Sequence, residues 1–135
     1  MTVRAGYSGT PLPRKLGIKE GHRVLLAAAP PDFDLGPLPG VTVTRRAAGS
    51  AYDVILVFTP DLRSLERRFV PLIERMVRNG GLWVAWPKRS SGLATDLDEN
   101  VVRDLGLAAG LVDNKVCAID ATWSGLRFVI RLRDR

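Results

Sequence analysis

Lys88, Ser91 and Thr95 are the residues whose types and spacing best suit ligand binding. They lie in the stretch 87–95, which separates an apolar segment from Asp96. An ammonium group attracts an anion, hydroxyl groups can donate hydrogen bonds to it, and a helix beginning at Asp96 would add unpaired N–H groups. The spacing predicts a site for a phosphate or a carboxylate in this loop. The alternative is a solvated connection that leads into a capped helix.

Two further segments could take part in binding. Ser8 and Thr10 lie in the glycine-rich stretch 6–10, whose backbone N–H groups could form an anion-binding nest that closes over the same site. The alternative is a tight lead-in in which Thr10 caps a short helix with Pro11 at its first position. Trp123 is expected in the turn between the last two strands, where an exposed indole could anchor a protein partner.

The sequence offers little for catalysis or metal binding. His22 is the only histidine and Cys117 the only cysteine, so a cysteine-built or multi-histidine metal site cannot form within this chain. We predict that Cys117 is an inert thiol in a strand and that no metal is bound. Asp96 and Glu99 have the spacing of a helix capping box, which explains the acidic cluster around them without catalytic chemistry.

Strands and helices alternate along most of the chain, and these elements must position the candidate residues. A continuous apolar run indicates a strand buried on both faces, and apolar residues recurring every three or four positions indicate a helix packed on the sheet. The predicted strands are 23–28, 41–44, 52–58, 82–86, 115–119 and 128–132. The predicted helices are a short turn after Thr10, a helix capped by Thr59, kinked or divided at Pro71 and ended by 79–81, and a third from Asp96 to Gly106 or Gly110.

This order of elements predicts the architecture. The strands 23–28, 52–58 and 82–86 are expected to be adjacent and parallel, with the last two strands pairing antiparallel through a turn at 120–125. The predicted fold class is α/β: a Rossmann-like three-layer sandwich, with a mostly parallel sheet and an antiparallel C-terminal edge pair. We expect residues 1–135 to form a single α/β domain with a Gly/Pro-rich lead-in.

Composition narrows the choice of partners. Twenty Lys and Arg residues against fourteen Asp and Glu give a formal net charge of +6, which favours a nucleotide, a nucleic acid or an acidic protein surface as partner. No run of Lys and Arg interleaves with aromatic residues, as a strand-binding platform would require. The apolar runs are far shorter than the roughly 20 residues of a membrane helix. We therefore expect no membrane partner and a cytoplasmic location.

The second half of the chain resembles class I methyltransferases. The resemblance covers residues 52–132 and rests on Tyr52-Asp53-Val54 before a hydrophobic strand and on Gly80-Gly81-Leu82 before the next one. It implies a Rossmann-like architecture, and such a fold hosts many functions. The first half departs from this family, because the first strand is followed by Ala27-Ala28-Ala29-Pro30-Pro31-Asp32 instead of a glycine-rich loop. Prolines lack the N–H donors that such a loop supplies, so we predict no cofactor and no tight binding of S-adenosylmethionine (SAM).

Three strings of residues resemble a family of small bacterial proteins known only as a domain of unknown function. They are Gly6-Tyr7-Ser8-Gly9-Thr10-Pro11-Leu12, then Trp86-Pro87-Lys88 with Ser91-Gly92 and Thr95-Asp96, and finally Asp113-Asn114-Lys115-Val116-Cys117-Ala118 with Trp123-Ser124-Gly125-Leu126. The likeness runs nearly end to end. It implies no mechanism, so no catalytic residue follows from it.

Three hypotheses for function remain open. The leading one is a non-enzymatic binding or regulatory module that contacts an anionic small molecule or a protein partner, because the sequence shows no cofactor loop, nucleophile–base pair or set of metal ligands. The first alternative is a degenerate methyltransferase-like transferase whose ligand loop is rebuilt from 87–95. The second alternative, a nucleic-acid-binding accessory protein, rests only on the net charge.

Overall fold

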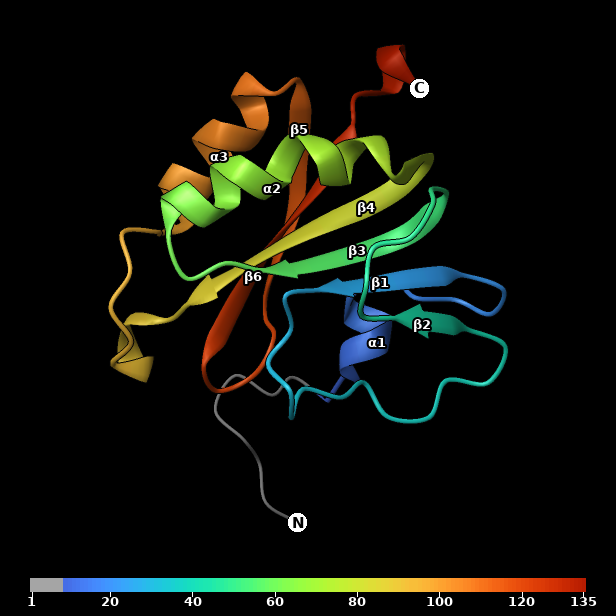
Figure 1. The fold of residues 1–135 in the computed structure, drawn as a ribbon, viewed down its shortest axis with the longest axis horizontal. Helices are drawn as coiled ribbons and strands as arrows, with labels where there is room; N and C mark the ends of the chain where they lie inside the picture. The colour runs from blue at the N-terminus through green and yellow to red at the C-terminus, as the bar shows by residue number, and fades with distance from the viewer. Residues whose placement is uncertain (1–8) are drawn as a thin grey trace.

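The computed structural model describes residues 9–135, which form one six-stranded sheet with helices on it (Figure 1). The strands in chain order are β1 (Arg23–Ala27), β2 (Thr42–Thr44), β3 (Tyr52–Phe58), β4 (Met76–Pro87), β5 (Leu111–Ala118) and β6 (Trp123–Ile130). The helices are α1 (Leu12–Lys15), α2 (Leu62–Glu74) and α3 (Glu99–Ala108), with the short 3-10 turns η1 (Arg89–Ser91) and η2 (Leu132–Asp134). In the part of the chain described, no helix is long and apolar enough to span a membrane.

The sheet order is β2-β1-β3-β4-β6-β5. The pairs β1–β2, β1–β3 and β3–β4 are parallel, whereas β4–β6 and β6–β5 are antiparallel. The predicted core of three adjacent parallel strands and the antiparallel pair at the C-terminal edge are therefore confirmed. The fold is a Rossmann-like α/β sandwich.

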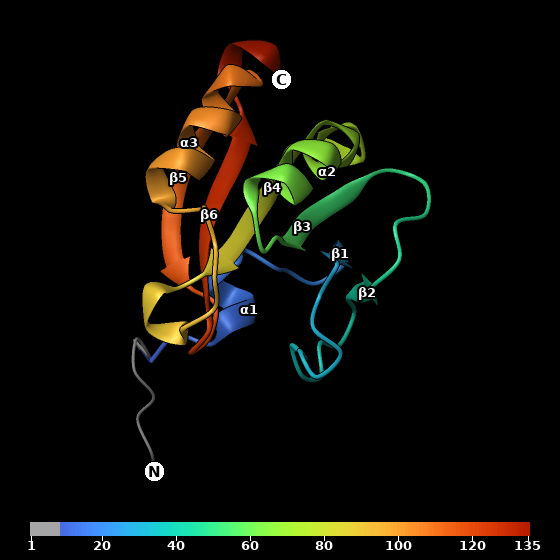
Figure 2. The same ribbon diagram turned by 60° about the vertical axis from the view of Figure 1, so that its left-hand side comes forward.

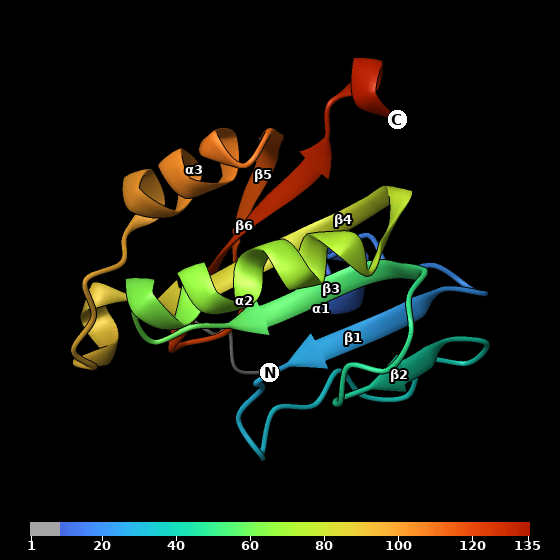
Figure 3. The same cartoon turned by 45° about the horizontal axis from the view of Figure 1, so that its top comes forward.

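The two faces of the sheet are covered differently. The long helices α2 and α3 pack on one face, α2 along β3 and β4 and α3 along β5 and β6 (Figure 2). The opposite face is covered by α1, which has four residues (Figure 3), and by the irregular segment 28–41. This segment contributes the buried ring of Phe33. Trp83 is fully buried on this second face, and its indole N–H donates to the Leu16 carbonyl at 3.0 Å, which ties the end of α1 to the sheet.

The end of α2 differs from the prediction. The helix stops at Glu74, three residues after Pro71, and is not divided there. Asn79, Gly80 and Gly81, expected to end the helix, instead lie inside β4. The reason is packing: a Cβ at Gly80 would lie 2.9 Å from the backbone carbonyl oxygen of Asp53.

The helix caps also differ from the predictions. Asp61, rather than Thr59, caps α2 by accepting from the Ser64 N–H at 2.8 Å. Asp98, rather than Asp96, caps α3 and accepts from the Val101 N–H at 2.9 Å, so the predicted capping box is wrong. The Asp96 carboxylate reaches instead to the first turn of α2.

Two smaller corrections concern α1 and the C-terminal hairpin. Pro11 precedes α1 as its N-cap residue, with no side-chain cap, so the predicted cap by Thr10 is wrong. The hairpin strands are longer than expected, and the turn is confined to 119–122. Trp123 is consequently the first residue of β6 and lies outside the turn.

Candidate functional site

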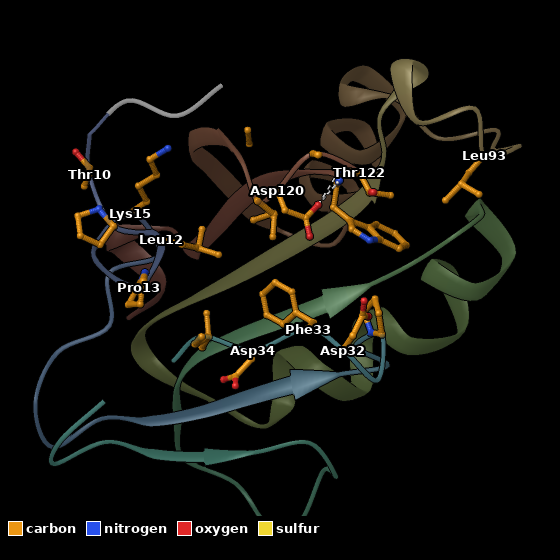
Figure 4. A pocket seen from close by; sticks show the side chains of 17 residues that line it. Thr10, Leu12, Pro13, Lys15, Asp32, Phe33, Asp34, Leu93, Asp120 and Thr122 are labelled. Atoms are coloured by element: carbon orange, nitrogen blue, oxygen red, sulfur yellow. Dashed lines mark hydrogen bonds between the residues drawn. The ribbon is translucent and has the colours of Figure 1, made fainter. Parts of the chain in front are cut away.

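A pocket of about 760 Å³ opens at the carboxyl edge of the sheet, where β1, β3 and β4 end and β6 begins. Its walls come from three segments that are far apart in sequence: residues 10–15 around α1, the irregular segment 30–35 after β1, and the hairpin turn 118–123. Figure 4 shows these three groups around the pocket, with Leu93, from the loop after η1, at the end away from Thr10. Ligands of open parallel sheets bind at this edge.

The hairpin wall is held by Asp120. Its Oδ1 accepts from the N–H of Thr122 at 2.8 Å and from the N–H of Trp123 at 2.9 Å, which closes the turn (Figure 4). The half-buried indole of Trp123 packs edge-on against Phe58, with ring centroids 5.1 Å apart. The hairpin therefore presents an aromatic surface and a carboxylate side by side.

Phe33, from the segment after β1, packs at the carboxyl end of β3. Its ring lies edge-on against Phe58, the last residue of β3, at 4.9 Å between centroids and is 8% exposed. The connections after β1 and β3 lead to opposite sides of the sheet, so the crevice between these two strands is the topological switch point, where cofactors of Rossmann-like proteins bind. In this chain an aromatic side chain of the protein itself lies beside that position.

The segment that carries Phe33 is fixed by an arginine. The Arg45 guanidinium, just after β2, donates to the Pro30 carbonyl at 3.2 Å and also to the Phe33 carbonyl. At the start of the segment, Ala28 has φ +55°, a conformation that costs an alanine about 1–2 kcal/mol. Backbone strain of this kind persists only where surrounding contacts enforce it, and here the contacts are those of the Phe33 segment.

The pocket carries more acidic than basic side chains. Asp32, Asp34 and Asp120 line it and are exposed, and Lys15, which is half-buried, is the one basic residue among its lining residues. Asp34 closes its own loop by accepting from the Gly36 N–H at 2.8 Å. The local balance of charge is thus opposite to the balance over the whole chain.

The predicted site residues do not all reach this pocket. Thr10 and Trp123 line it, whereas Ser8 lies outside the described residues. Lys88, Ser91 and Thr95 lie beside it without lining it, and only Leu93 from their loop does so.

The hydroxyls of Ser91 and Thr95 make local contacts. Ser91 Oγ donates to the Lys88 carbonyl at 2.6 Å and accepts from the Leu93 N–H at 3.2 Å. Thr95 Oγ1 accepts from the Leu97 N–H at 3.0 Å. The Asp96 carboxylate accepts a hydrogen bond from the Leu62 N–H at 2.8 Å, so one N–H group at the start of α2 is already bonded within the protein. Anion binding by this loop stays a prediction.

The remaining candidate side chains lie elsewhere. Burial raises the pKa of the Cys117 thiol above its ordinary value, which disfavours the reactive thiolate. His22 lies before β1, at the opposite edge of the sheet, where its Nδ1 accepts from the Lys19 N–H at 3.1 Å. Within residues 9–135, no three His, Cys, Asp or Glu side chains are grouped so that they could hold a metal ion.

Sequence reasoning missed Phe33, Asp34 and Asp120 as parts of the site. The position of the hairpin follows from the antiparallel pairing of β6 with β4, because such a strand begins where β4 ends, but the sequence predicted only that the last two strands pair with each other. Phe33 could not have been found from the sequence, because an aromatic residue that folds back from an irregular segment belongs to no periodic pattern.

No family model matches the chain, and no curated protein matches it, so the resemblance to a small bacterial family stays a prediction. Among solved structures, LepI in complex with SAM superposes with a TM-score of 0.51 at 15% identity, over 89% of this chain and 39% of LepI. A LepI variant in complex with SAH and a substrate analogue superposes with a TM-score of 0.51 at 16% sequence identity, over 93% of this chain and 40% of LepI.

A putative methyltransferase from Thermoplasma acidophilum is also similar, with a TM-score of 0.48 at 10% identity, over 84% of this chain and 70% of that one. The chain spans about two fifths of the length of LepI. At these identities the likeness concerns the fold alone. The chain has a Rossmann-like α/β fold.

Proposed function

We propose that this chain is a degenerate methyltransferase-like protein that binds a small organic molecule in the carboxyl-edge pocket, next to a cofactor crevice that Phe33 has closed. The observation that carries the proposal is the pocket itself, which has a volume suited to small-molecule ligands. Its lining combines apolar and aromatic side chains with a few polar groups, as is typical of ligand sites.

The position of the pocket supports the same proposal. The ends of the central parallel strands and the start of β6 meet there, so residues from three distant segments can contact one ligand. Asp120 and Arg45 hold two of those segments in place by hydrogen bonds to the backbone. A wall fixed before binding loses little conformational entropy when a ligand arrives.

A fragment screen read by amide chemical shifts tests the proposal. Fragments that bind are expected to shift the amide signals of Ala118, Thr122 and Trp123. Ala121→Trp adds an indole at an exposed position of the pocket wall and should abolish these shifts. Ala108→Trp, at an exposed position of α3 outside the pocket, is the matched control and should leave them unchanged. Fragments that bind equally well to the Ala121→Trp variant would place the site elsewhere.

SAM-dependent methyl transfer is the second candidate function, because the fold resembles that of a protein solved with SAM. The residues of this chain do not fit the cofactor. Phe33 packs on Phe58 at the end of β3, beside the crevice, and Pro30 and Pro31 remove two N–H donors from the segment after β1. Arg45, the first residue after β2, uses its guanidinium to hold that segment. We therefore propose no methyl transfer through SAM for this site.

A further inference from the structure

We infer that the carboxyl-edge pocket selects organic cations with a flat apolar body, an inference that rests on the proposed function and names its ligand class. The first support is electrostatic. Asp32, Asp34 and Asp120 contribute three carboxylates to the lining, and Lys15 contributes one ammonium group. The sign of the charge in the pocket is therefore opposite to that of the whole chain, whose formal net charge is +6.

The carboxylates keep free capacity for a ligand. Asp120 and Asp34 each use Oδ1 to close a turn, and in the part of the chain described their Oδ2 atoms have no hydrogen-bond partner. Asp32 makes no side-chain hydrogen bond to residues 9–135. The turns fix where two of the three charges lie, so a cation entering the pocket meets carboxylates that are already oriented.

Aromatic side chains supply the second support. Phe33 and Trp123 pack on the two sides of Phe58, at 4.9 and 5.1 Å between ring centroids, and both line the pocket. Trp123 adjoins Asp120 in the chain and is only half-buried. An indole is the aromatic group that attracts cations most strongly, and its ring also stacks on flat apolar groups. The ligand is therefore expected to combine a ring with a positive charge.

The same observations argue against other ligand classes. A metal ion would need three or more ligands brought together, and no such group exists within residues 9–135. An anion would be repelled by three carboxylates. The one basic lining residue, Lys15, belongs to the α1 wall, whereas Asp120 belongs to the hairpin wall and Asp32 and Asp34 to the segment after β1, so a ligand near these carboxylates meets negative charge (Figure 4).

Three indole derivatives test the inference, because they share one ring and differ in charge. The probes are tryptamine, a cation; tryptophol, which is neutral; and indole-3-acetate, an anion. Binding is followed through the amide signals of Thr122 and Trp123, whose N–H groups bond to Asp120. Tryptamine is expected to bind about tenfold more tightly than tryptophol, since one cation–π contact and one or two exposed ion pairs each contribute modestly.

Matched variants assign that preference to the carboxylates. Asp120→Asn keeps an oxygen that can close the turn, so it removes the charge without opening the hairpin. Together with Asp32→Asn it should reduce the preference for tryptamine over tryptophol to about twofold or less. Asp104→Asn, at an exposed position on α3 outside the pocket, is the control and should leave the preference unchanged.

Each outcome decides the inference. A tenfold preference that the double variant removes supports it. Equal binding of the three probes at Thr122 and Trp123, or a preference for indole-3-acetate, overturns the cation preference while leaving small-molecule binding at the pocket intact. If none of the three probes shifts these signals, the inference is wrong, and the fragment screen with Ala121→Trp then decides separately whether the pocket binds any ligand.

Discussion

The two faces of the sheet are built by different means. On one face, α2 and α3 carry regular apolar stripes and begin at side-chain caps, Asp61 and Asp98. On the other face, a four-residue helix and the segment 28–41 cover the strands with Phe33 and with aliphatic side chains such as Leu16 and Leu35. The candidate pocket lies on this second face. Regular helices leave little room between themselves and a sheet, whereas an irregular cover can enclose a cavity.

Truncating one phenylalanine on each face compares the two covers directly. Phe69 on α2 packs against Phe128 at 5.7 Å and is 2% exposed, so Phe69→Ala should lower the free energy of unfolding by about 4 kcal/mol. Phe33→Ala should cost about 3 kcal/mol or less, because an irregular segment can collapse into the space better than a helix can. Denaturant unfolding of both variants measures the difference. A larger loss for Phe33→Ala would show that the irregular face is the more rigid one.

Relieving the backbone strain at Ala28 tests the irregular cover by stabilising it instead of truncating it. Ala28→Gly should raise the free energy of unfolding by about 1 kcal/mol, because glycine adopts φ +55° freely and this gain outweighs the added entropy of the unfolded chain. Ala29→Gly, at the next position, is the control and should destabilise slightly. Thermal unfolding of the pair provides the measurement. Destabilisation by Ala28→Gly would mean that the alanine side chain has contacts worth more than the strain.

The smallest expected effect is on the face covered by α2 and α3, where the contribution of the α2 cap to the free energy of unfolding depends on pH. The hydrogen bond from the Ser64 N–H lowers the pKa of Asp61 below its ordinary value. A carboxyl group whose pKa is lowered in the folded state stabilises the protein above its unfolded pKa of about 3.9, and this contribution is lost as the pH falls through the folded pKa.

Asp61→Asn keeps an acceptor for the cap but cannot titrate. The free energy of unfolding of this variant should therefore fall less steeply with acid than that of the original chain. Asp104→Asn serves as the reference, since Asp104 is exposed and makes no side-chain hydrogen bond to the residues described. Identical slopes for Asp61→Asn and the original chain between pH 5 and pH 2 (about one unit above to two units below the reference pKa) would contradict the cap.

The difference between the faces also explains what the sequence could predict. Strands such as 52–58 and the stripe of α2 are set by local periodicity, so the three adjacent parallel strands and the antiparallel last pair followed from the chain alone. Gly80 and Gly81 were misassigned, because glycine ends helices and also permits close packing inside a strand, and the close approach of the Asp53 carbonyl to Gly80 appears only in the structure. Asp96 was misassigned because its partner, Leu62, lies 34 residues away.

The candidate site was less predictable than the fold. The residue types of the loop 87–95 predicted a site for an anion, yet the hydroxyls of Ser91 and Thr95 close local turns in the structure. The pocket arises instead from 10–15, 30–35 and 118–123, which meet only after the sheet has formed. Contacts between such distant segments leave no periodic pattern in the sequence.

The central proposal is that Phe33 and Arg45 close the crevice in which a Rossmann-like fold would hold its cofactor. Calorimetric titration of the protein with SAM tests this claim most directly. We predict no saturable binding up to millimolar SAM, a bound that corresponds to a binding free energy weaker than about −4 kcal/mol. Binding with micromolar affinity would contradict the claim, because it would require a crevice that Phe33 does not fill.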